Sequence, residues 1–236
     1  MAGAHVPAPD RRLHRRLPRC HAATRRSRLL RRAAVQIFLI RHPRPLLESG
    51  VCYGQLDVEA EDPLPLARRL RAFLPADTPV IASPLQRALG LAKALNTQAR
   101  VDARLMEVDF GEWEGQRWSD IDRQLLDQWA ANVLHFAPPG GESAALLQAR
   151  VVDCVDSLCA EPGKRLALVT HAGAIRAALG YWLQLPIDQW SRLPLAFGSI
   201  SLLEIDAPGG LQRAGDRHGE ATQEPATAAQ LLYINR

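Results

Sequence analysis

Two arginines, two histidines and a glutamate stand just after short apolar segments of this sequence. Arg41 and His42 follow the first segment, Arg87 comes soon after the second, Glu107 follows the third and His171 follows the fourth. Arginine offers paired donors that fit phosphate oxygens, a neutral imidazole can attack phosphorus, and a carboxylic acid can protonate a leaving alkoxide. Together these residue types suit the transfer of a phosphoryl group, for which no metal ion or other cofactor is required.

The elements that must bring these residues together alternate between strands and helices. The patterns predict strands at 35–40, 80–82, 101–105, 166–170, 199–205 and 230–234, and helices at 64–74, 84–95, 119–134, 142–159 and 172–183. This order predicts an α/β fold, a three-layer α/β/α sandwich with a mostly parallel sheet. Ligands of such sheets bind beyond the carboxyl ends of the strands, where the five residues would meet.

Each of the five residues taken alone has an ordinary structural explanation, such as a hydrogen-bonded core histidine or a solvated helix arginine. The hypothesis depends on all of them falling at strand ends. Two helix starts, after Ser83 as the expected N-cap and after His171, would add backbone N–H donors there. His135, at the end of the predicted helix 119–134, has no such partners and is interpreted as structural.

The motifs around these residues resemble those of the histidine phosphatase superfamily, which has the phosphoglycerate-mutase-like fold. They read LIRHP at 39–43, SPLQRA at 83–88, LME at 105–107 and VTHAG at 169–173. The resemblance covers residues 34–236 and implies a metal-independent phosphomonoesterase in which His42 is phosphorylated. It also implies that Arg41, Arg87 and His171 hold the phosphate and that Glu107 donates and accepts the proton.

One position departs from the family pattern. The usual glycine after the phosphorylated histidine is Pro43 here. Proline has no N–H group and a fixed φ, so any backbone donation at that position is lost. The next residue, Arg44, is a candidate for a compensating contact to the substrate, with a solvated surface arginine as the alternative.

Further motifs are most similar to those of α-ribazole phosphatases, which remove a 5′-phosphate during assembly of the cobalamin nucleotide loop. They read VCYGQLDV at 51–58, DFGEWEG at 109–115 and PGGES at 139–143. The substrate-binding residues expected on this basis are Arg41, Arg44, Tyr53, Gly54, Arg87, His171 and Ala172. Tyr53, Trp113 and Trp118 can stack on a heterocyclic base, and core packing is an equal alternative for each tryptophan.

Two other enzymatic functions stay open. A broad-specificity small-molecule phosphatase would share the same motifs. A phosphoglycerate mutase must retain and rebind a phosphorylated intermediate, and the short segment between Arg87 and Glu107 leaves no room for the long insertions of mutases, which favours hydrolysis. The segment 119–160 is expected to form a helical insert that covers the site and sets specificity.

The charge of the chain is concentrated at its N-terminus. Ten of the 29 basic residues and one of the 25 acidic residues lie in 1–33, so residues 34–236 carry a net charge of −5 although the whole chain carries +4. We expect 1–33 to be a disordered Arg-rich tail, with an organelle transit peptide or a nucleic-acid-binding arm as alternatives. A non-catalytic nucleic-acid-binding protein is the alternative from another functional class, and the acidic remainder of the chain argues against it.

The remaining composition predicts a cytoplasmic protein with a small-molecule phosphate ester as its partner, as a monomer or homodimer. No apolar run approaches the ~20 residues of a membrane span. The four cysteines, Cys20, Cys52, Cys154 and Cys159, show no CxxC spacing and predict neither a metal site nor a redox site. Cys154 and Cys159 are interpreted as buried apolar residues of a protein in a reducing compartment.

Overall fold

A computed structural model of the chain describes residues 34–159, 164–205 and 229–235. These residues belong to one compact unit, Arg32–Arg236. The expectations for the Arg-rich tail 1–33 and for Cys20 lie outside the described residues. Within the described part, none of the helices has the length and hydropathy that a membrane span requires.

A six-stranded sheet forms the centre of this unit, in the order β3-β2-β4-β1-β5-β6. The strands are β1 (Val35–Arg41), β2 (Val80–Ala82), β3 (Arg100–Val101), β4 (Arg165–Thr170), β5 (Ile200–Ile205) and β6 (Ala229–Tyr233). The neighbouring strands from β3 to β1 run parallel to one another. Strand β5 is antiparallel both to β1 and to β6. The predicted mostly parallel α/β sheet is confirmed.

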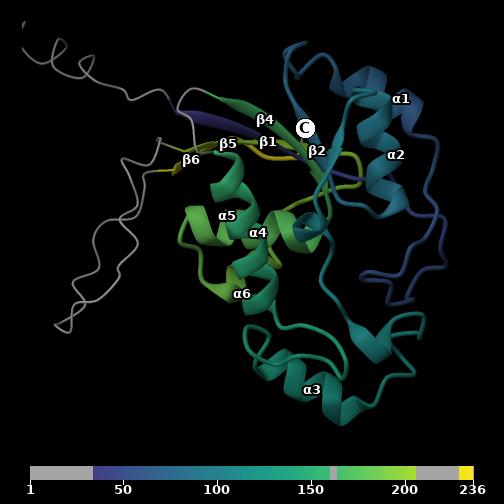
Figure 1. The fold of residues 1–236 in the computed structure, drawn as a ribbon. Coiled ribbons are helices and arrows are strands. Elements are labelled where there is room, and N and C mark those ends of the chain that lie inside the picture. Colours follow the sequence, from purple (N-terminus) through teal and green to yellow (C-terminus); the bar gives the residue numbers. More distant parts are fainter. Residues whose placement is uncertain (1–33, 160–163, 206–228, 236) are drawn as a thin grey trace, which may run out of the picture. The chain divides into compact units, whose positions relative to one another are not determined.

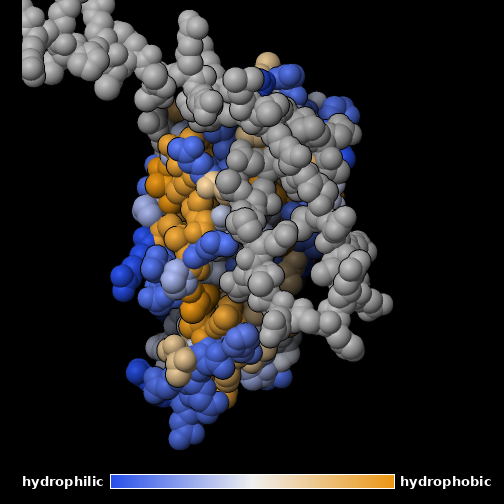
Figure 2. Space-filling model, turned by 90° about the vertical axis from the view of Figure 1, so that its left-hand side faces the viewer, coloured by the Kyte–Doolittle hydropathy of each residue, from blue (hydrophilic) through white to orange (hydrophobic). Residues whose placement is uncertain are grey.

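Helices cover both faces of the sheet (Figure 1). Helices α1 (Pro63–Leu70) and α2 (Gln86–Leu95) pack on one face, and α4 (Ala144–Leu158) and α5 (Ala172–Trp182) pack on the other, where the short α6 (Ile187–Trp190) joins them. Helix α3 (Arg123–Ala131) lies apart from the sheet (Figure 1). On the side of α5 and α6 the surface carries a band of apolar side chains between hydrophilic margins (Figure 2).

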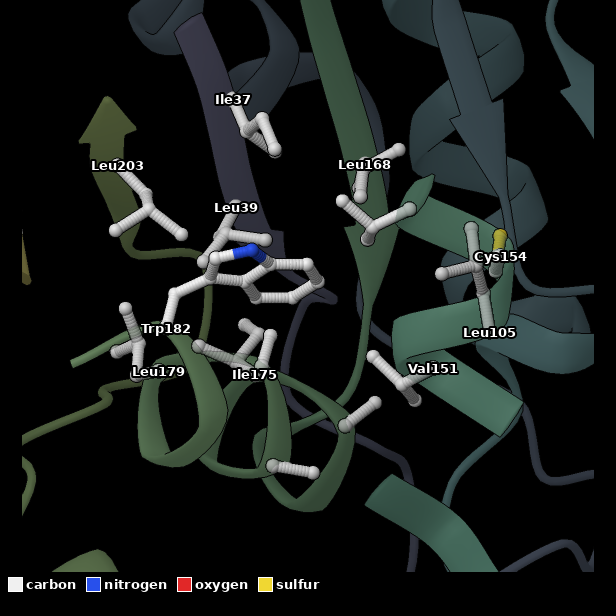
Figure 3. Packing of buried hydrophobic residues seen from close by; sticks show 14 of the residues in the cluster. Ile37, Leu39, Leu105, Val151, Cys154, Leu168, Ile175, Leu179, Trp182 and Leu203 are labelled. Atoms are coloured by element: carbon white, nitrogen blue, oxygen red, sulfur yellow. The ribbon is translucent and has the colours of Figure 1, made fainter. Parts of the chain in front are cut away.

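The alternation of side chains along the strands builds two separate cores. Ile37 and Leu39 of β1 belong to the cluster under α4 and α5, whereas Phe38 and Ile40 belong to the cluster under α1 and α2. Figure 3 shows the first core, to which Leu39 of β1 and Trp182 of α5 both belong. Burial of each large apolar side chain stabilises the fold by about 1.5–3 kcal/mol, so both faces of the sheet hold it in place.

The predicted strand 101–105 is wrong. The strand β3 ends at Val101, and Ala103–Leu105 forms a 3₁₀ turn, η1, instead. The side chain of Asp102 causes this, because its carboxylate accepts a hydrogen bond from the backbone N–H of Arg104 at 2.9 Å and caps the turn. Glu107 therefore follows a turn and not a strand.

The second predicted helix begins later than expected, and Ser83 is not its N-cap. Helix α2 begins at Gln86 with Leu85 at the N-cap. The N–H of Gln86 is bound by the side chain of Asp57 at 2.7 Å, while the Ser83 hydroxyl lies 2.8 Å from Nε2 of His171. The Ser83 hydroxyl also accepts from the N–H of Leu85 at 3.3 Å, so it serves the turn before α2 together with His171 and does not cap the helix itself.

Two other helices are shorter than predicted. Helix α1 ends at Leu70, and the chain from 71 to 74 continues as a turn. Helix α3 covers only Arg123–Ala131 of the predicted 119–134, because Asp122 caps its start by accepting hydrogen bonds from the N–H groups of Gln124 and Leu125. Helices α4 and α5 lie within about two residues of their predicted bounds.

The cysteines of the described part are free and buried, as predicted for Cys154 and Cys159. Burial raises the pKa of the Cys52, Cys154 and Cys159 thiols to about 12. A thiol with such a pKa stays protonated at neutral pH and is a poor nucleophile or metal ligand. The residues that the structure describes contain no group of three or more His, Cys, Asp or Glu side chains able to hold a metal ion.

Candidate active site

Strand pairing brings the predicted site residues to one edge of the sheet. Arg41 is the register partner of Thr170, and the N–H of His42 donates to the Thr170 carbonyl at 3.0 Å. The N–H of Ser83 donates to the Val169 carbonyl of the same strand at 3.0 Å. The rings of His42 and His171 consequently lie 5.0 Å apart, centroid to centroid.

His42 is held as a neutral imidazole with one nitrogen free. Its Nδ1 lies 2.6 Å from the carbonyl oxygen of Pro43, which can only accept, so Nδ1 carries the proton and Nε2 carries the lone pair. Burial lowers the pKa of His42 to about 3; the Pro43 carbonyl opposes this shift, and the cations Arg87 and Arg41 add to it. A neutral imidazole with a free Nε2 can act as a nucleophile at neutral pH.

The replacement of the family's glycine by Pro43 leaves this arrangement intact. The contact that position 43 makes with His42 uses its carbonyl oxygen, which proline retains. Proline removes only the N–H group. The departure from the family pattern therefore does not disturb the orientation of the His42 ring.

His171 is the second buried histidine of the site. Its Nε2 lies 2.8 Å from the Ser83 hydroxyl, and its Nδ1 is buried without a hydrogen-bond partner. Burial, together with the positive charges around it, lowers the pKa of His171 well below the ordinary value. Ser83 therefore positions His171, and the unpaired Nδ1 is a polar atom that an oxygen of a bound phosphate could satisfy.

Backbone carbonyls fix the two arginines. Arg87, which is 2% exposed, donates to the carbonyls of Leu56 at 2.8 Å and Gly54 at 2.5 Å. Arg41 donates to the Leu195 carbonyl, and its guanidinium lies 3.7 Å from the centre of the Phe197 ring. Burial lowers the pKa of both arginines, and the charge of Glu107 opposes this shift. Each guanidinium has five N–H donors, so donors remain for phosphate oxygens.

The Glu107 carboxylate is oriented by two backbone N–H groups. One oxygen accepts from the N–H of Gly173 at 3.1 Å and the other from the N–H of Val108 at 3.0 Å. Gly173 belongs to the first turn of α5, where unpaired N–H groups favour an anion. A Cβ at position 173 would lie 2.1 Å from Glu107 Oε1, so only glycine allows this approach.

Arg150 of α4 positions the Glu107 segment and was not predicted. Its guanidinium donates to the carbonyls of Arg104, Met106 and Glu107, each at 2.8 Å, and pairs with the Glu142 carboxylate. Nothing in the local sequence distinguishes this arginine from a solvated one. Its role comes only from the packing of α4 against η1.

A cavity of about 670 Å³ opens beside this cluster. Arg41, Glu107 and Ala172 form part of its wall, and the rings of Trp118 and Trp129 form another part. His42, Arg87 and His171 do not line this cavity, and they are 1%, 2% and 0% exposed. The centre of the Phe197 ring lies 5.6 Å from that of His42, so Phe197 is a close neighbour of the histidine.

The predicted substrate-binding residues divide into two groups. Tyr53, Gly54 and Ala172 line the cavity, and Gly54 also holds Arg87 through its carbonyl. Arg44 does not line it: its side chain is 66% exposed and lies 3.9 Å from the Glu61 carboxylate. Arg44 is therefore exposed and does not line the cavity, but its guanidinium lies 5.2 Å from the centre of the Phe197 ring, the same ring that contacts Arg41 and His42.

The predicted aromatic residues also divide. Trp118 lines the cavity as expected, together with Trp129, which the sequence did not single out. Trp113 is buried and packs against Phe136, which agrees with the alternative interpretation of this tryptophan as a core residue. The cavity wall continues through Ala130–Leu134, at the end of α3 and in the loop after it, and through Ala144 and Leu147 of α4, which also packs into the main core.

The low pKa of His42 predicts a specific loss of stability in acid. In the unfolded chain this histidine binds a proton once the pH falls below its ordinary pKa of 6.5. In the folded protein it binds the proton only near pH 3, because its pKa is lowered to about 3. The contribution of His42 to the free energy of unfolding is complete above pH 6.5 and is lost as the pH falls towards 3. Between pH 7 and pH 5 this loss amounts to about 2 kcal/mol. Urea unfolding at both pH values measures it. In His42→Asn the loss between pH 7 and pH 5 should be smaller by that amount, and equal losses in the two proteins would contradict the assignment.

Comparisons with known proteins agree with this geometry. The family model of the histidine phosphatase superfamily (branch 1) matches residues 37–214. A glucosyl-3-phosphoglycerate phosphatase of Mycobacterium tuberculosis is 29% identical over 203 residues, which cover 75% of this chain and 88% of the relative. A solved mycobacterial glucosyl-3-phosphoglycerate phosphatase superposes with a TM-score of 0.69 at 25% identity, over 86% of this chain and 99% of its own.

A more distant structural neighbour bears on the α-ribazole motifs. It is an Escherichia coli protein to which alpha-ribazole-5′-P phosphatase activity has been attributed, with a TM-score of 0.67 at 19% identity over 86% of this chain and 97% of its own. Identity this low shows a shared fold and no more. The family match and the arrangement of the five residues carry the classification: this chain belongs to the histidine phosphatase superfamily and is a phosphoric monoester hydrolase.

Proposed function

We propose that the protein hydrolyses small-molecule phosphomonoesters in two steps, through a phosphohistidine on His42. The observation that carries this proposal is the contact of His42 Nδ1 with the Pro43 carbonyl, which leaves Nε2 unprotonated between two arginines and a second histidine. In the first step Nε2 attacks phosphorus, and the ester P–O bond breaks. Glu107 in its protonated form gives the proton to the leaving alkoxide.

The second step returns the enzyme to its starting state. Water attacks the phosphohistidine, Glu107 accepts the proton from this water, and the P–N bond breaks to release inorganic phosphate and neutral His42. Arg41, Arg87 and His171 bind the equatorial oxygens of the phosphoryl group and balance its charge in both steps. In this mechanism protein side chains supply the stabilising charge, and it needs no metal ion.

Two classes of substrate have support. The similarity to glucosyl-3-phosphoglycerate phosphatases favours a phosphate ester of a hydroxy acid. The rings of Trp118 and Trp129 in the cavity wall favour a flat or cyclic group next to the phosphate, which also suits the heterocycle of α-ribazole 5′-phosphate. A phosphatase of broad specificity would accept both classes.

Hydrolysis assays on the purified full chain test this function. The panel contains p-nitrophenyl phosphate, glucosyl-3-phosphoglycerate, 3-phosphoglycerate and α-ribazole 5′-phosphate, each with and without EDTA. We expect phosphate release that EDTA leaves unchanged, and a kcat/KM preference of about 10²-fold for one ester would identify the substrate. Loss of activity in EDTA with recovery in Mg²⁺ would contradict the mechanism, and conversion of 3-phosphoglycerate to 2-phosphoglycerate would indicate a mutase.

A further inference from the structure

A further arginine of the cavity wall has no side-chain partner among the residues that the structure describes. Arg176 of α5 lines the cavity together with Arg41 and Glu107. Its Nε is buried without a hydrogen bond, and its guanidinium makes no ion pair with any described residue. Nε of Arg41 and Nε of Arg87 are buried without a partner as well, but the terminal nitrogens of those two guanidiniums donate to backbone carbonyls. A buried charged donor without an acceptor is unfavourable, so a group that supplies the acceptor would be bound strongly.

Helix geometry places this guanidinium close to the phosphate-binding residues. Arg176 follows Gly173 by three residues, so the two lie on the same face of α5, and the N–H of Gly173 binds Glu107. Side chains on a helix lean towards its N-terminus, which for Arg176 is the end that begins after His171. Consistent with this proximity, the charge of Arg176 contributes to lowering the pKa of Arg41.

None of the acidic side chains of the cavity wall forms an ion pair with Arg176 among the described residues. Glu142 pairs with Arg150, and Glu107 accepts from two backbone N–H groups. Asp188 also lines the cavity, and no ion pair joins it to Arg176. Arg176 therefore makes no ion pair with a described carboxylate, in a cavity wall that is otherwise largely apolar.

We propose that Arg176 binds a carboxylate of the substrate, so that the enzyme selects phosphate esters of small hydroxy acids. The inference rests on the phosphatase function proposed above. A carboxylate matches the paired N–H groups of a guanidinium, and it supplies the acceptor that Nε lacks. With its phosphate at Arg41 and its carboxylate at Arg176, the substrate is fixed at two points, and the rest of the molecule extends towards Trp118 and Trp129.

Two esters that differ in one group test this assignment. In glycerol 3-phosphate a hydroxymethyl group replaces the carboxylate of 3-phosphoglycerate, and the ester bond that breaks is the same. We expect the wild type to prefer 3-phosphoglycerate by at least about 10-fold in kcat/KM. Arg176→Gln should lower kcat/KM for 3-phosphoglycerate by about 10- to 100-fold, mainly by raising KM. The same variant should change kcat/KM for glycerol 3-phosphate by less than about 2-fold.

Two further variants complete the experiment. Arg176→Lys keeps the charge without the paired donors and should recover part of the preference. Arg68→Gln removes the same charge from an exposed position of α1 that does not line the cavity. This variant should leave kcat/KM unchanged for both esters. Equal losses on both esters in Arg176→Gln, no loss on either, or a wild type without a preference would each overturn the assignment. A wild type that also fails to hydrolyse p-nitrophenyl phosphate would instead refute the proposed function.

Discussion

Replacement of His42 by asparagine is expected to reduce kcat by at least about 10³-fold on every phosphate ester, because the reaction then has no nucleophile. Asparagine is close to histidine in size, and its side-chain amide can still donate to the Pro43 carbonyl, so the backbone turn at 42–43 keeps its partner. It has no basic nitrogen in place of Nε2. The variant therefore separates the chemistry of the ring from its packing.

Rapid quenching with ³²P-labelled substrate gives the direct measurement. The wild type should show a transient phosphoenzyme, and His42→Asn should show none. His135→Asn is the matched control, because His135 is exposed and does not line the cavity; it should retain the wild-type rate. Burst-phase labelling of folded His42→Asn protein would mean that another residue, such as His171, is the nucleophile.

The fold and most of the site could be predicted because the information is local. Apolar runs such as Val35–Arg41 and Arg165–Thr170 are typical of strands buried on both faces, and parallel pairing then places their carboxyl ends together. The proximity of Arg41, His42 and His171 follows from this rule, whereas Arg87 belongs to α2 and is fixed by the carbonyls of Leu56 and Gly54. For the three residues at the strand ends, no side-chain contact had to be known in advance.

The position of Glu107 could not be predicted in the same way. The sequence suggested a strand before it, but the Asp102 cap turns the chain into η1, and long-range contacts then fix the segment. These contacts come from Thr170, whose hydroxyl donates to the Leu105 carbonyl, from Arg150 of α4 and from Gly173 of α5. Residues of these types have no local sequence signature for such a role.

Ser83 shows how a tertiary contact can override a local signal. Serine before proline is typical of a helix N-cap, and the prediction followed that pattern. In the structure the Ser83 hydroxyl contacts His171 and accepts from the N–H of Leu85 in the turn before the helix, and α2 begins three residues later, at Gln86. Where a local rule fails beside a catalytic residue, the failure itself indicates that the side chain serves the site.

Glu107→Gln is expected to slow the hydrolysis of alkyl phosphates by about 10²- to 10⁴-fold and that of p-nitrophenyl phosphate far less. An alkoxide is a poor leaving group and needs a proton as the P–O bond breaks, whereas p-nitrophenolate leaves without one. Glutamine has the same shape as glutamate and can still accept the hydrogen bond from Gly173, but it has no proton to transfer. The size of the effect should therefore follow the basicity of the leaving group.

A series of esters with alcohols of graded pKa turns this expectation into a slope. In Glu107→Gln, log(kcat/KM) should fall more steeply with leaving-group pKa than in the wild type, because only the wild type protonates the departing oxygen. Glu112→Gln is the matched control, since Glu112 is exposed and does not line the cavity, and its slope should equal that of the wild type. A parallel shift of the Glu107→Gln line, with equal loss for all esters, would assign the carboxylate to positioning and not to proton transfer. The slope therefore separates the two roles that the contacts of Glu107 with Gly173 and Val108 allow.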